Sequence, residues 1–271
     1  MPRRRDIGDP ALAGRLRKAL RGEVRFDAFT RGRYSTDASI YQIEPIGVAL
    51  PQDTADVEAA LAIAREEGVP VIPRGGGSSQ NGQTLGEAVV MDTSRHMNRV
   101  LEVDANAGTA MVQPGIVLDE LNRQLKPTGW TFPVDVSTSA NATLGGMTGN
   151  NSAGTRSIKY GIMVHNVLEV EAVLADGSRI AFGEVPADLG SSPKRLREIA
   201  QTLRALYANN AEEIALRVPK LLRKVGGYNL DTLGEPKVNL AKLLVGSEGT
   251  LGFFTRIKLK LHRIPKHRVG A

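Results

Sequence analysis

Three consecutive glycines at residues 75–77, followed by Ser78 and Ser79, are the residues of this chain best suited to binding an anion. Glycine lacks a Cβ and tolerates positive φ, so such a loop can present main-chain N–H groups as a concave nest for phosphate. It is not a P-loop, because no Gly-Lys-Ser/Thr sequence follows, and Gln80 stands where a dinucleotide fingerprint has its third glycine. A flexible surface turn is the alternative for a triple glycine taken alone.

A second stretch, residues 133–154, combines glycines with Ser, Thr and Asn side chains and holds a single charged residue, Asp135. It lies within residues 127–161, where no hydrophobic period is sustained over 35 residues, a length typical of a functional loop. Main-chain groups beside glycines can hydrogen-bond along the edge of a large, flat ligand that carries a pyrophosphate. The two stretches together predict a site for such a ligand.

Other site chemistries find little support in the sequence. The chain has no Cys, which excludes disulfides, iron–sulfur clusters and cysteinyl-flavin links within it. We expect no metal site, because the four His residues are scattered; they are His96, His165, His262 and His267. His165 fits a hydrogen-bonded core residue better than a general base. Ser247 has no base at a fixed spacing that would make it a nucleophile.

The elements that must position these stretches follow from hydrophobic periodicity. Residues 46–50 predict a strand, a helix runs from Asp53 or Thr54 to Gly68, and residues 69–72 predict a second strand. This order indicates a small α/β unit with parallel strands. The pattern also predicts strands at residues 88–91, 100–103, 109–112 and 256–261, helices at 116–125 and 193–209, and a hairpin of 167–174 with 178–181.

The net charge of the chain is concentrated at its start. Residues 1–33 hold ten basic and four acidic side chains, which accounts for the whole net charge of +6. A nucleic-acid binder would carry basic and aromatic residues through its body, but aromatics are only 4% here. We therefore expect a solvated amphipathic helix over residues 10–21, with a polyanion or membrane-surface contact as the alternative. No apolar run suits a membrane span and no signal peptide is recognisable, so a cytoplasmic protein is expected.

Five spaced motifs, in this order, resemble the FAD-binding domain of the vanillyl-alcohol oxidase (PCMH-type) superfamily. They are residues 73–78, 143–154, 160–168, 175–177 and 245–252, and the resemblance runs from about residue 40 to residue 262. Within the superfamily the chain is most similar to FAD-linked D-2-hydroxy acid dehydrogenases, a group that includes D-lactate dehydrogenase of the cytochrome type, glycolate oxidase and D-2-hydroxyglutarate dehydrogenase. The resemblance implies an α+β fold of two α/β subdomains with FAD between them.

The resemblance also implies which residues contact FAD. Residues 74–79 would form the pyrophosphate loop, residues 133–138 with 145–148 would line the other side of the flavin, and Val167 would contact the adenine end. The implied cofactor-binding residues are Arg74, Gly75, Gly76, Gly77, Ser78, Ser79, Gly82, Pro133, Asp135, Ser137, Thr138, Gly145, Gly146, Thr148, Asn151, Gly154, Tyr160, Gly161 and Val167.

Three departures or open points accompany this assignment. Asn151 and Gly154 match a family Thr-Asn-Ala-Gly-Gly run, but Asn150 and Ala153 replace two of its members. Some superfamily members attach flavin through a His in the glycine loop, where this chain has serines, so non-covalent FAD is expected. Tyr228 and Asn229 would approach the substrate side, and an ordinary half-buried core tyrosine is the alternative for Tyr228.

The expected domains are a basic helical extension over residues 1–39, FAD-binding subdomains over 40–105 and 106–265, and no substrate cap domain. The resemblance implies oxidation of a small D-2-hydroxy acid (lactate, glycolate or 2-hydroxyglutarate class) to the 2-oxo acid, with hydride transfer to FAD. A cap domain, an iron–sulfur module and an electron acceptor, which could lie at the inner membrane, would be partners, and no catalytic residue is assigned. A flavin reductase of the enolpyruvyl-glucosamine reductase type and a non-enzymatic basic module remain alternatives.

Overall fold

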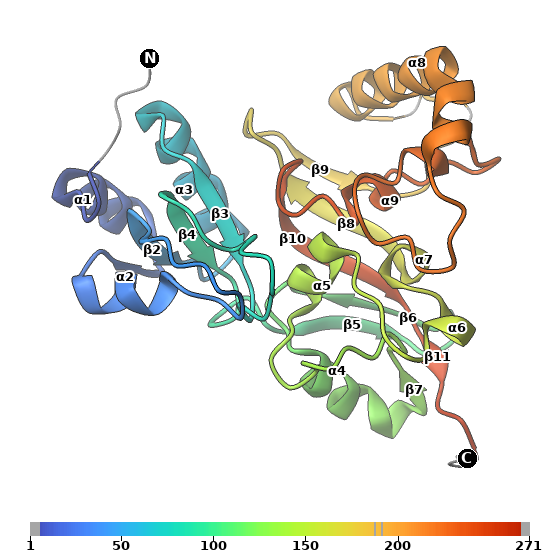
Figure 1. The fold of residues 1–271 in the computed structure, drawn as a ribbon, viewed down its shortest axis with the longest axis horizontal. Coiled ribbons are helices and arrows are strands. Elements are labelled where there is room, and N and C mark those ends of the chain that lie inside the picture. Colours follow the sequence, from blue (N-terminus) through green and yellow to red (C-terminus); the bar gives the residue numbers. More distant parts are fainter. Residues whose placement is uncertain (1–5, 187, 191, 267–271) are drawn as a thin grey trace.

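The structure is a computed structural model that describes residues 6–186, 188–190 and 192–266. Its strands and helices form two lobes that lie side by side, each around its own sheet (Figure 1). The basic residues Arg3, Arg4 and Arg5, and also His267, lie outside the described residues. The α+β class expected from the sequence is the class observed.

The first lobe contains a four-stranded sheet in the order β1-β2-β4-β3. β2 (Gly47–Leu50), β4 (Val89–Asp92) and β3 (Val71–Arg74) are parallel, whereas β1 (Glu23–Arg25) is antiparallel to β2. The sheet is flanked by α1 (Pro10–Ala19), α2 (Ala28–Tyr34) and α3 (Thr54–Glu67).

The α3 helix begins and ends where its capping residues predict. The carboxylate of Asp53 accepts hydrogen bonds from the N–H groups of Ala55 and Asp56, which have no partner within the helix. Gly68 follows with a φ of +65°, a conformation that glycine adopts without steric cost. β3 then runs through Arg74, so the glycine loop starts directly at the carboxyl end of a parallel strand.

Residues before β2 are built into the first lobe. Leu12 and Leu16 of α1 are each only 1% exposed and belong to the same hydrophobic core as Val57 of α3. β1 pairs with β2 from Glu23 opposite Leu50 to Arg25 opposite Val48. Residues 10–34, which fall within the helical extension expected over residues 1–39, therefore pack and pair within the first lobe. The three residues of β1 are too few to show an alternating pattern in the sequence.

The second lobe contains a five-stranded antiparallel sheet in the order β5-β6-β10-β8-β9. The hairpin expected around residues 176–177 is present, because β8 pairs with β9. Its strands are β5 (Val100–Asp104), β6 (Thr109–Val112), β10 (Phe253–Lys260), β8 (Val167–Val173) and β9 (Arg179–Phe182).

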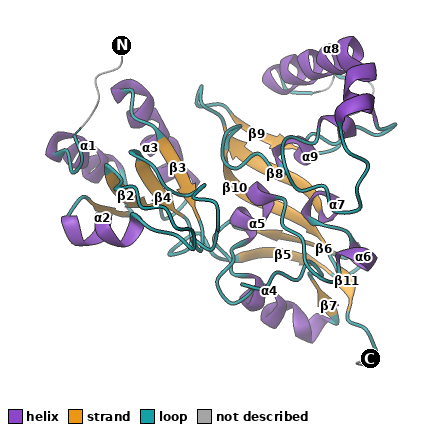
Figure 2. Ribbon diagram, in the orientation of Figure 1, coloured by secondary structure: helices purple, strands orange, loops and turns teal. Residues whose placement is uncertain are grey.

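Short elements surround this second sheet. The stretch 127–161, expected to lack regular structure, contains β7 (Trp130–Thr131), α5 (Leu144–Asn150) and α6 (Ser157–Tyr160). The long α8 (Lys194–Arg217) extends beyond the expected end at residue 209 and lies beside β9 (Figure 2). The elements are α4 (Leu118–Leu125), η1 (Lys126–Thr128), β7 (Trp130–Thr131) paired with β11 (His262–Arg263), α5 (Leu144–Asn150), α6 (Ser157–Tyr160), α7 (Met163–Asn166), α8 (Lys194–Arg217), η2 (Leu230–Gly234) and α9 (Ala241–Leu244).

Among the described residues, no helix has both the length and the apolar character needed to span a bilayer.

Candidate functional site

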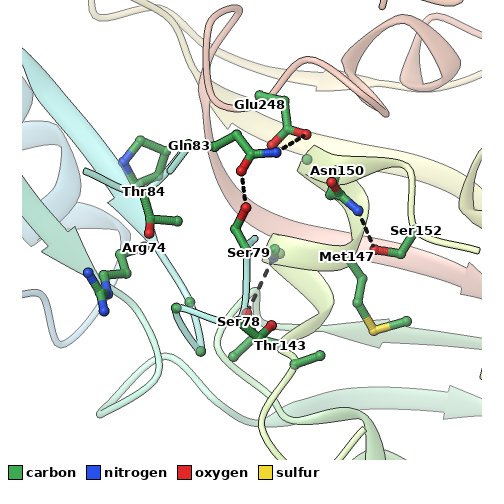
Figure 3. A pocket seen from close by; sticks show the side chains of 18 of the residues that line it. Arg74, Ser78, Ser79, Gln83, Thr84, Thr143, Met147, Asn150, Ser152 and Glu248 are labelled. Atoms are coloured by element: carbon green, nitrogen blue, oxygen red, sulfur yellow. Dashed lines mark hydrogen bonds between the residues drawn. The ribbon is translucent and has the colours of Figure 1, made fainter. Parts of the chain in front are cut away.

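A cavity of about 410 Å³ lies between the two lobes (Figure 3). The first lobe supplies one wall through residues of the glycine loop, from Pro73 to Thr84. The second lobe supplies the other through residues within 136–153 and 248–254, together with Pro114. The volume falls within the range of small-molecule and cofactor sites, and location between lobes is common for them. The two stretches that the sequence analysis singled out therefore meet at one cavity.

The glycine loop offers main-chain donors to this cavity. No described residue accepts a hydrogen bond from the main-chain N–H groups of residues 75–79. Gly77 has a φ of +63°, which L side chains rarely adopt. Unpaired N–H groups on a curved loop form the kind of nest that binds an anion without a cationic side chain. Ser78, whose side chain also lines the cavity, adds a hydroxyl.

Two of the glycines are needed because the lobes touch here. A Cβ on Gly75 would overlap the Thr143 hydroxyl, and a Cβ on Gly76 would overlap the main-chain carbonyl oxygen of Asn141. The first-lobe loop therefore packs directly on residues 141–143 of the second lobe. The absence of side chains both permits this packing and leaves the loop's N–H groups uncovered.

The second wall is built around the start of α5, where the first three main-chain N–H groups of the helix are already paired. The N–H of Leu144 donates to the Ile116 carbonyl at 2.9 Å, and that of Gly145 donates to the Pro114 carbonyl at 2.7 Å. The N–H of Gly146 donates to the Thr143 hydroxyl at 3.3 Å. The start of α5 therefore contributes shape and neutral polar groups to the cavity, and its N–H groups are not available to an anion.

The cavity lining carries two charged residues among those described, Arg74 and Glu248. The Arg74 guanidinium donates to the carbonyls of Tyr34 and Thr36, at 3.2 and 2.7 Å, within the first lobe. Glu248 stands at the rim with a φ of +49°, and Gln83 Nε2 donates to its Oε1 at 3.5 Å. Glu248 as a whole residue is exposed. Partial desolvation of its carboxylate nevertheless raises the pKa of Glu248 above its usual range.

The structure brings about half of the predicted cofactor residues together. They share a place on the two facing walls of the cavity: Arg74, Gly75, Gly76, Gly77, Ser78, Ser79, Ser137, Thr138, Gly145 and Gly146. Gln83 and Phe254 also line the cavity but lie outside every segment that the sequence analysis assigned to the ligand. Thr143, Met147, Ser152 and Glu248 lie within those segments but were not listed as cofactor contacts. Thr143 carried a usable signal, since Thr before an apolar residue and two glycines is a helix N-cap candidate.

The other predicted residues lie outside the cavity lining but within the described part of the chain: Gly82, Pro133, Asp135, Thr148, Asn151, Gly154, Tyr160, Gly161 and Val167. Several of them hold the second wall in place. Asp135 accepts a hydrogen bond from the N–H of Arg156 at 2.8 Å, and a Cβ on Gly154 would overlap the Asp135 carbonyl oxygen. These residues fold the 133–157 segment on itself.

Asn151 is the main anchor behind α5. It is fully buried, with a φ of +52°, and its Oδ1 accepts from the N–H of Val164 at 3.0 Å. Its Nδ2 donates to the Lys224 carbonyl at 3.2 Å. Thr148 donates its hydroxyl hydrogen to the Leu144 carbonyl within the helix. Both side chains therefore bond to main-chain groups and face away from the cavity lining.

The remaining outlying residues contact other parts of the protein. Val167 is 2% exposed and pairs with Leu259 in the sheet. The Tyr160 carbonyl accepts from Asn166 Nδ2 at 2.9 Å. A Cβ on Gly161 would lie 2.7 Å from His165 Nδ1. A Cβ on Gly82 would lie 2.9 Å from the Tyr41 ring.

The two residues predicted for the substrate side differ from each other. Tyr228 is 44% exposed, and its hydroxyl is 2.7 Å from that of Thr250. Asn229 is 1% exposed and donates both amide hydrogens to main-chain carbonyls, those of Lys242 and Val245. Neither residue lines the cavity. The Asn229 side chain therefore stabilises the main chain around α9.

The described histidines and Ser247 form no catalytic group. His165 Nδ1 accepts from the N–H of Ile162 at 3.1 Å, and desolvation is the largest cause of a lowered pKa for His165. The Ser247 hydroxyl is buried and makes no hydrogen bond to the described residues. No group of three His, Asp or Glu side chains within the described ranges is placed to hold a metal ion.

Comparison with known proteins decides the family. A family model described as an FAD binding domain matches residues 45–183, just over half of the chain. The chain belongs to this family of FAD-binding domains. Its match includes the glycine loop and the α5 wall of the cavity.

Relatives of this FAD-binding domain include D-2-hydroxyglutarate dehydrogenase of Escherichia coli, 38% identical over 86% of this chain and 24% of that protein. Glycolate oxidase subunit GlcD of Bacillus subtilis is 33% identical over 90% of the chain and 43% of GlcD. The chain thus spans about a quarter of the dehydrogenase and less than half of GlcD. The solved structure of an alkyldihydroxyacetonephosphate synthase shares the fold, with a TM-score of 0.66 and 23% identity over 95% of the chain and 41% of the synthase.

The cavity fits the cofactor of this family. A dinucleotide needs donors for its diphosphate, and the N–H groups of residues 75–79 are unpaired among the described residues. Main-chain dipoles can stabilise a diphosphate with little cationic charge from the walls. The one cation of the described lining, Arg74, donates its hydrogen bonds to main-chain carbonyls of the first lobe. FAD is therefore the cofactor of this domain, and the glycine loop is the part of the chain suited to its diphosphate.

Proposed function

We propose that the chain holds non-covalent FAD in the cavity between its lobes and forms the cofactor-binding part of an enzyme that oxidises a D-2-hydroxy acid to the 2-oxo acid. The observation that carries the proposal is the cavity itself, where the glycine loop, whose N–H groups at residues 75–79 donate to no described residue, lies opposite the neutral α5 wall. The 38% identity to a D-2-hydroxyglutarate dehydrogenase supports the substrate class.

In this mechanism the chain binds and orients. The N–H groups of residues 75–79 and the Ser78 hydroxyl would hold the diphosphate, and Thr138 and Ser137 offer hydroxyls on the opposite wall. When bound, FAD supplies a two-electron acceptor for the hydride of the substrate carbinol carbon. Phe254 and Met147 add apolar surface to the lining and exclude water from part of the cavity. No described residue of the cavity is assigned as the base.

The relatives and the charge pattern disfavour the alternatives. A basic binding module would use the cations near the chain's start, but two of these are already paired within the first lobe. Arg15 pairs with Glu66 and Glu67, and Arg21 pairs with Asp53. A reductase of the same superfamily is disfavoured because the relatives described above are named as a dehydrogenase and a glycolate oxidase subunit.

Filling the cavity from the α5 side tests the cofactor's place. Gly146 is exposed to the cavity, and a Cβ there would meet only the Thr143 hydroxyl, at 3.3 Å. Gly146→Leu should weaken FAD binding at least about tenfold, because the leucine occupies volume that the cofactor needs. Titration followed by flavin fluorescence measures this.

The matched control is Gly32→Leu in α2, where nothing lies within 4 Å of the added Cβ. It should bind FAD as the wild type does. Wild-type affinity in Gly146→Leu would defeat the placement of FAD in this cavity.

The reaction itself is tested on the full polypeptide that the gene encodes, loaded with FAD without oxygen. Addition of D-2-hydroxyglutarate, D-lactate or glycolate should bleach the visible flavin band, and L-2-hydroxyglutarate should not. A flavoprotein that none of the three acids bleaches would overturn the proposed activity.

Non-covalent attachment is tested by denaturing the FAD-loaded protein with acid. The flavin should be released into the supernatant, and colour that stays with the precipitated protein would contradict non-covalent binding.

A further inference from the structure

The charged group nearest the glycine loop is turned away from the cavity that it borders. Arg74 is the last residue of β3, and its side chain extends back into the first lobe, on the side opposite Asn150 and Ser152 of the α5 wall (Figure 3). A guanidinium beside a diphosphate site would ordinarily be assigned to charge neutralisation. Its contacts indicate another role.

The guanidinium of Arg74 is held by the segment that joins α2 to β2. Nη1 donates to the Tyr34 carbonyl at 3.2 Å, and Nη2 donates to the Thr36 carbonyl at 2.7 Å. The guanidinium carbon also lies 5.1 Å from the centre of the Tyr34 ring. A planar fork that binds two carbonyls and stacks on a ring has a fixed orientation, which a lysine ammonium cannot reproduce.

The same segment contacts the glycine loop at two further points. The N–H of Ala38 donates to the Gly77 carbonyl at 3.2 Å. The Thr84 hydroxyl donates to Asp37 Oδ2 at 3.2 Å, and Thr84 lines the cavity. Residues 34–38 therefore brace the loop from outside, at the position where Gly77 takes its positive φ.

The 34–38 segment is itself hydrogen-bonded to the sheet of the first lobe. The Tyr34 hydroxyl donates to Asp92 Oδ2 at 2.7 Å, and Asp92, at the end of β4, is 6% exposed. Burial is the largest cause of a strongly raised pKa for Tyr34, so its hydroxyl keeps the hydrogen it donates. Burial lowers the pKa of Arg74, and the charges of Asp92 and Asp37, both in the first lobe, oppose this shift.

From these contacts we infer that Arg74 is a positioning residue: with Tyr34 and the 34–38 segment it fixes the conformation in which residues 75–79 present their N–H groups, and it does not neutralise the diphosphate. The 34–38 segment precedes residues 45–183, the part matched by the family model. Cofactor affinity in this chain therefore depends on residues outside that match. The inference rests on the proposed place of FAD between the lobes.

Arg74→Lys is the decisive variant, because it keeps the charge and removes the fork. We expect the Kd for FAD to rise by about tenfold, because a charge-assisted pair of hydrogen bonds that fixes the loop is lost. The Kd for riboflavin, which has no phosphate, should stay unchanged. A plot of log Kd for FAD against log salt concentration should have a shallow slope that is the same in wild type and variant, since no charge contact to the diphosphate is broken.

Wild-type affinity for FAD in Arg74→Lys would overturn the inference, since a direct charge contact survives this change. A steep wild-type slope that flattens in Arg74→Met would overturn it as well. The matched control is Arg95→Lys, the same change at a side chain that is 67% exposed and outside the cavity lining. It should leave both the Kd and the slope unchanged.

Tyr34→Phe is the milder second variant and decides the matter if Arg74→Lys does not fold. It retains the ring and removes only the hydrogen bond to Asp92. The Kd for FAD should rise by about threefold with the salt slope unchanged, and an unchanged Kd would overturn the inference. Failure of the proposed function is seen separately: Gly146→Leu then binds FAD like the wild type, whatever Arg74→Lys does.

Discussion

The two walls of the interlobe cavity are both rich in glycine, yet their main-chain N–H groups are used differently. Those of residues 75–79 donate to no described residue, whereas those of Leu144, Gly145 and Gly146 are all paired inside the second lobe. The N–H groups of the glycine loop are therefore available to an anion, whereas those at the start of α5 are not. Glycine content alone does not separate a ligand-binding loop from a tightly packed one.

Gly76→Val has the largest expected effect on the contact between the two walls. A Cβ at this position overlaps the Asn141 carbonyl oxygen, so the loop must leave the second lobe or distort. We expect FAD binding to be lost and the free energy of unfolding to fall by about 2 kcal/mol. Denaturant titration and flavin fluorescence measure the two effects.

Gly226→Ala is the control for that change, because nothing lies within 4 Å of the added Cβ and its φ is not positive. Retained affinity in Gly76→Val would show that the loop does not need its contact with residue 141. The first wall would then bind FAD independently of the second.

Asn151→Ala changes the second wall and should have an intermediate effect on stability. The change removes two buried hydrogen bonds, to Val164 and Lys224, and puts alanine at a φ of +52°. We expect a loss of about 2 kcal/mol in stability, measured by thermal denaturation, and a smaller change in FAD affinity. A large loss of affinity with unchanged stability would instead place Asn151 in contact with the cofactor, as the family resemblance implies.

The smallest expected effect is a pH dependence of stability that arises from His262 in the second lobe. His262 Nε2 lies 3.1 Å from Asn166 Oδ1, and burial followed by the charges of Lys260 and Lys159 lowers the pKa of His262 below its ordinary value of 6.5. Because the folded form resists protonation, stability should fall as pH decreases below about 6.5. His262→Gln should flatten this decline, by less than about 1 kcal/mol, in denaturant titrations at several pH values. An equal decline in the variant would assign it to other groups.

The parts of the fold set by local chemistry were predictable. Asp53 and Gly68 mark the ends of α3, and the Asp176-Gly177 turn marks the β8–β9 hairpin. The start of the lobe was not predictable in this way, because β1 is recognised only by its pairing with β2. The length of α8 was also underestimated, since Asn209 and Asn210 interrupt the pattern of apolar residues but not the helix.

The candidate site divides along the same line. The glycine loop is contiguous in the sequence, so its donors could be predicted from residue types alone. The tasks of Asn151 and Asn229 depend on carbonyl groups of Lys224, Lys242 and Val245, which no local pattern brings together. Polar residues in a glycine-rich stretch were therefore assigned to the ligand, whereas several of them hydrogen-bond to the chain itself.

The pairing of β1 with β2 has a practical meaning for how this fold can be divided. A protein trimmed to the residues of the family match, beginning at residue 45, would lack the Phe26 ring that covers Gly47 and the strand that hydrogen-bonds to β2. All four residues of β2 are buried in the intact lobe. The trimmed protein would present that strand as a bare apolar edge, open to pairing with another molecule, and self-association is the expected result.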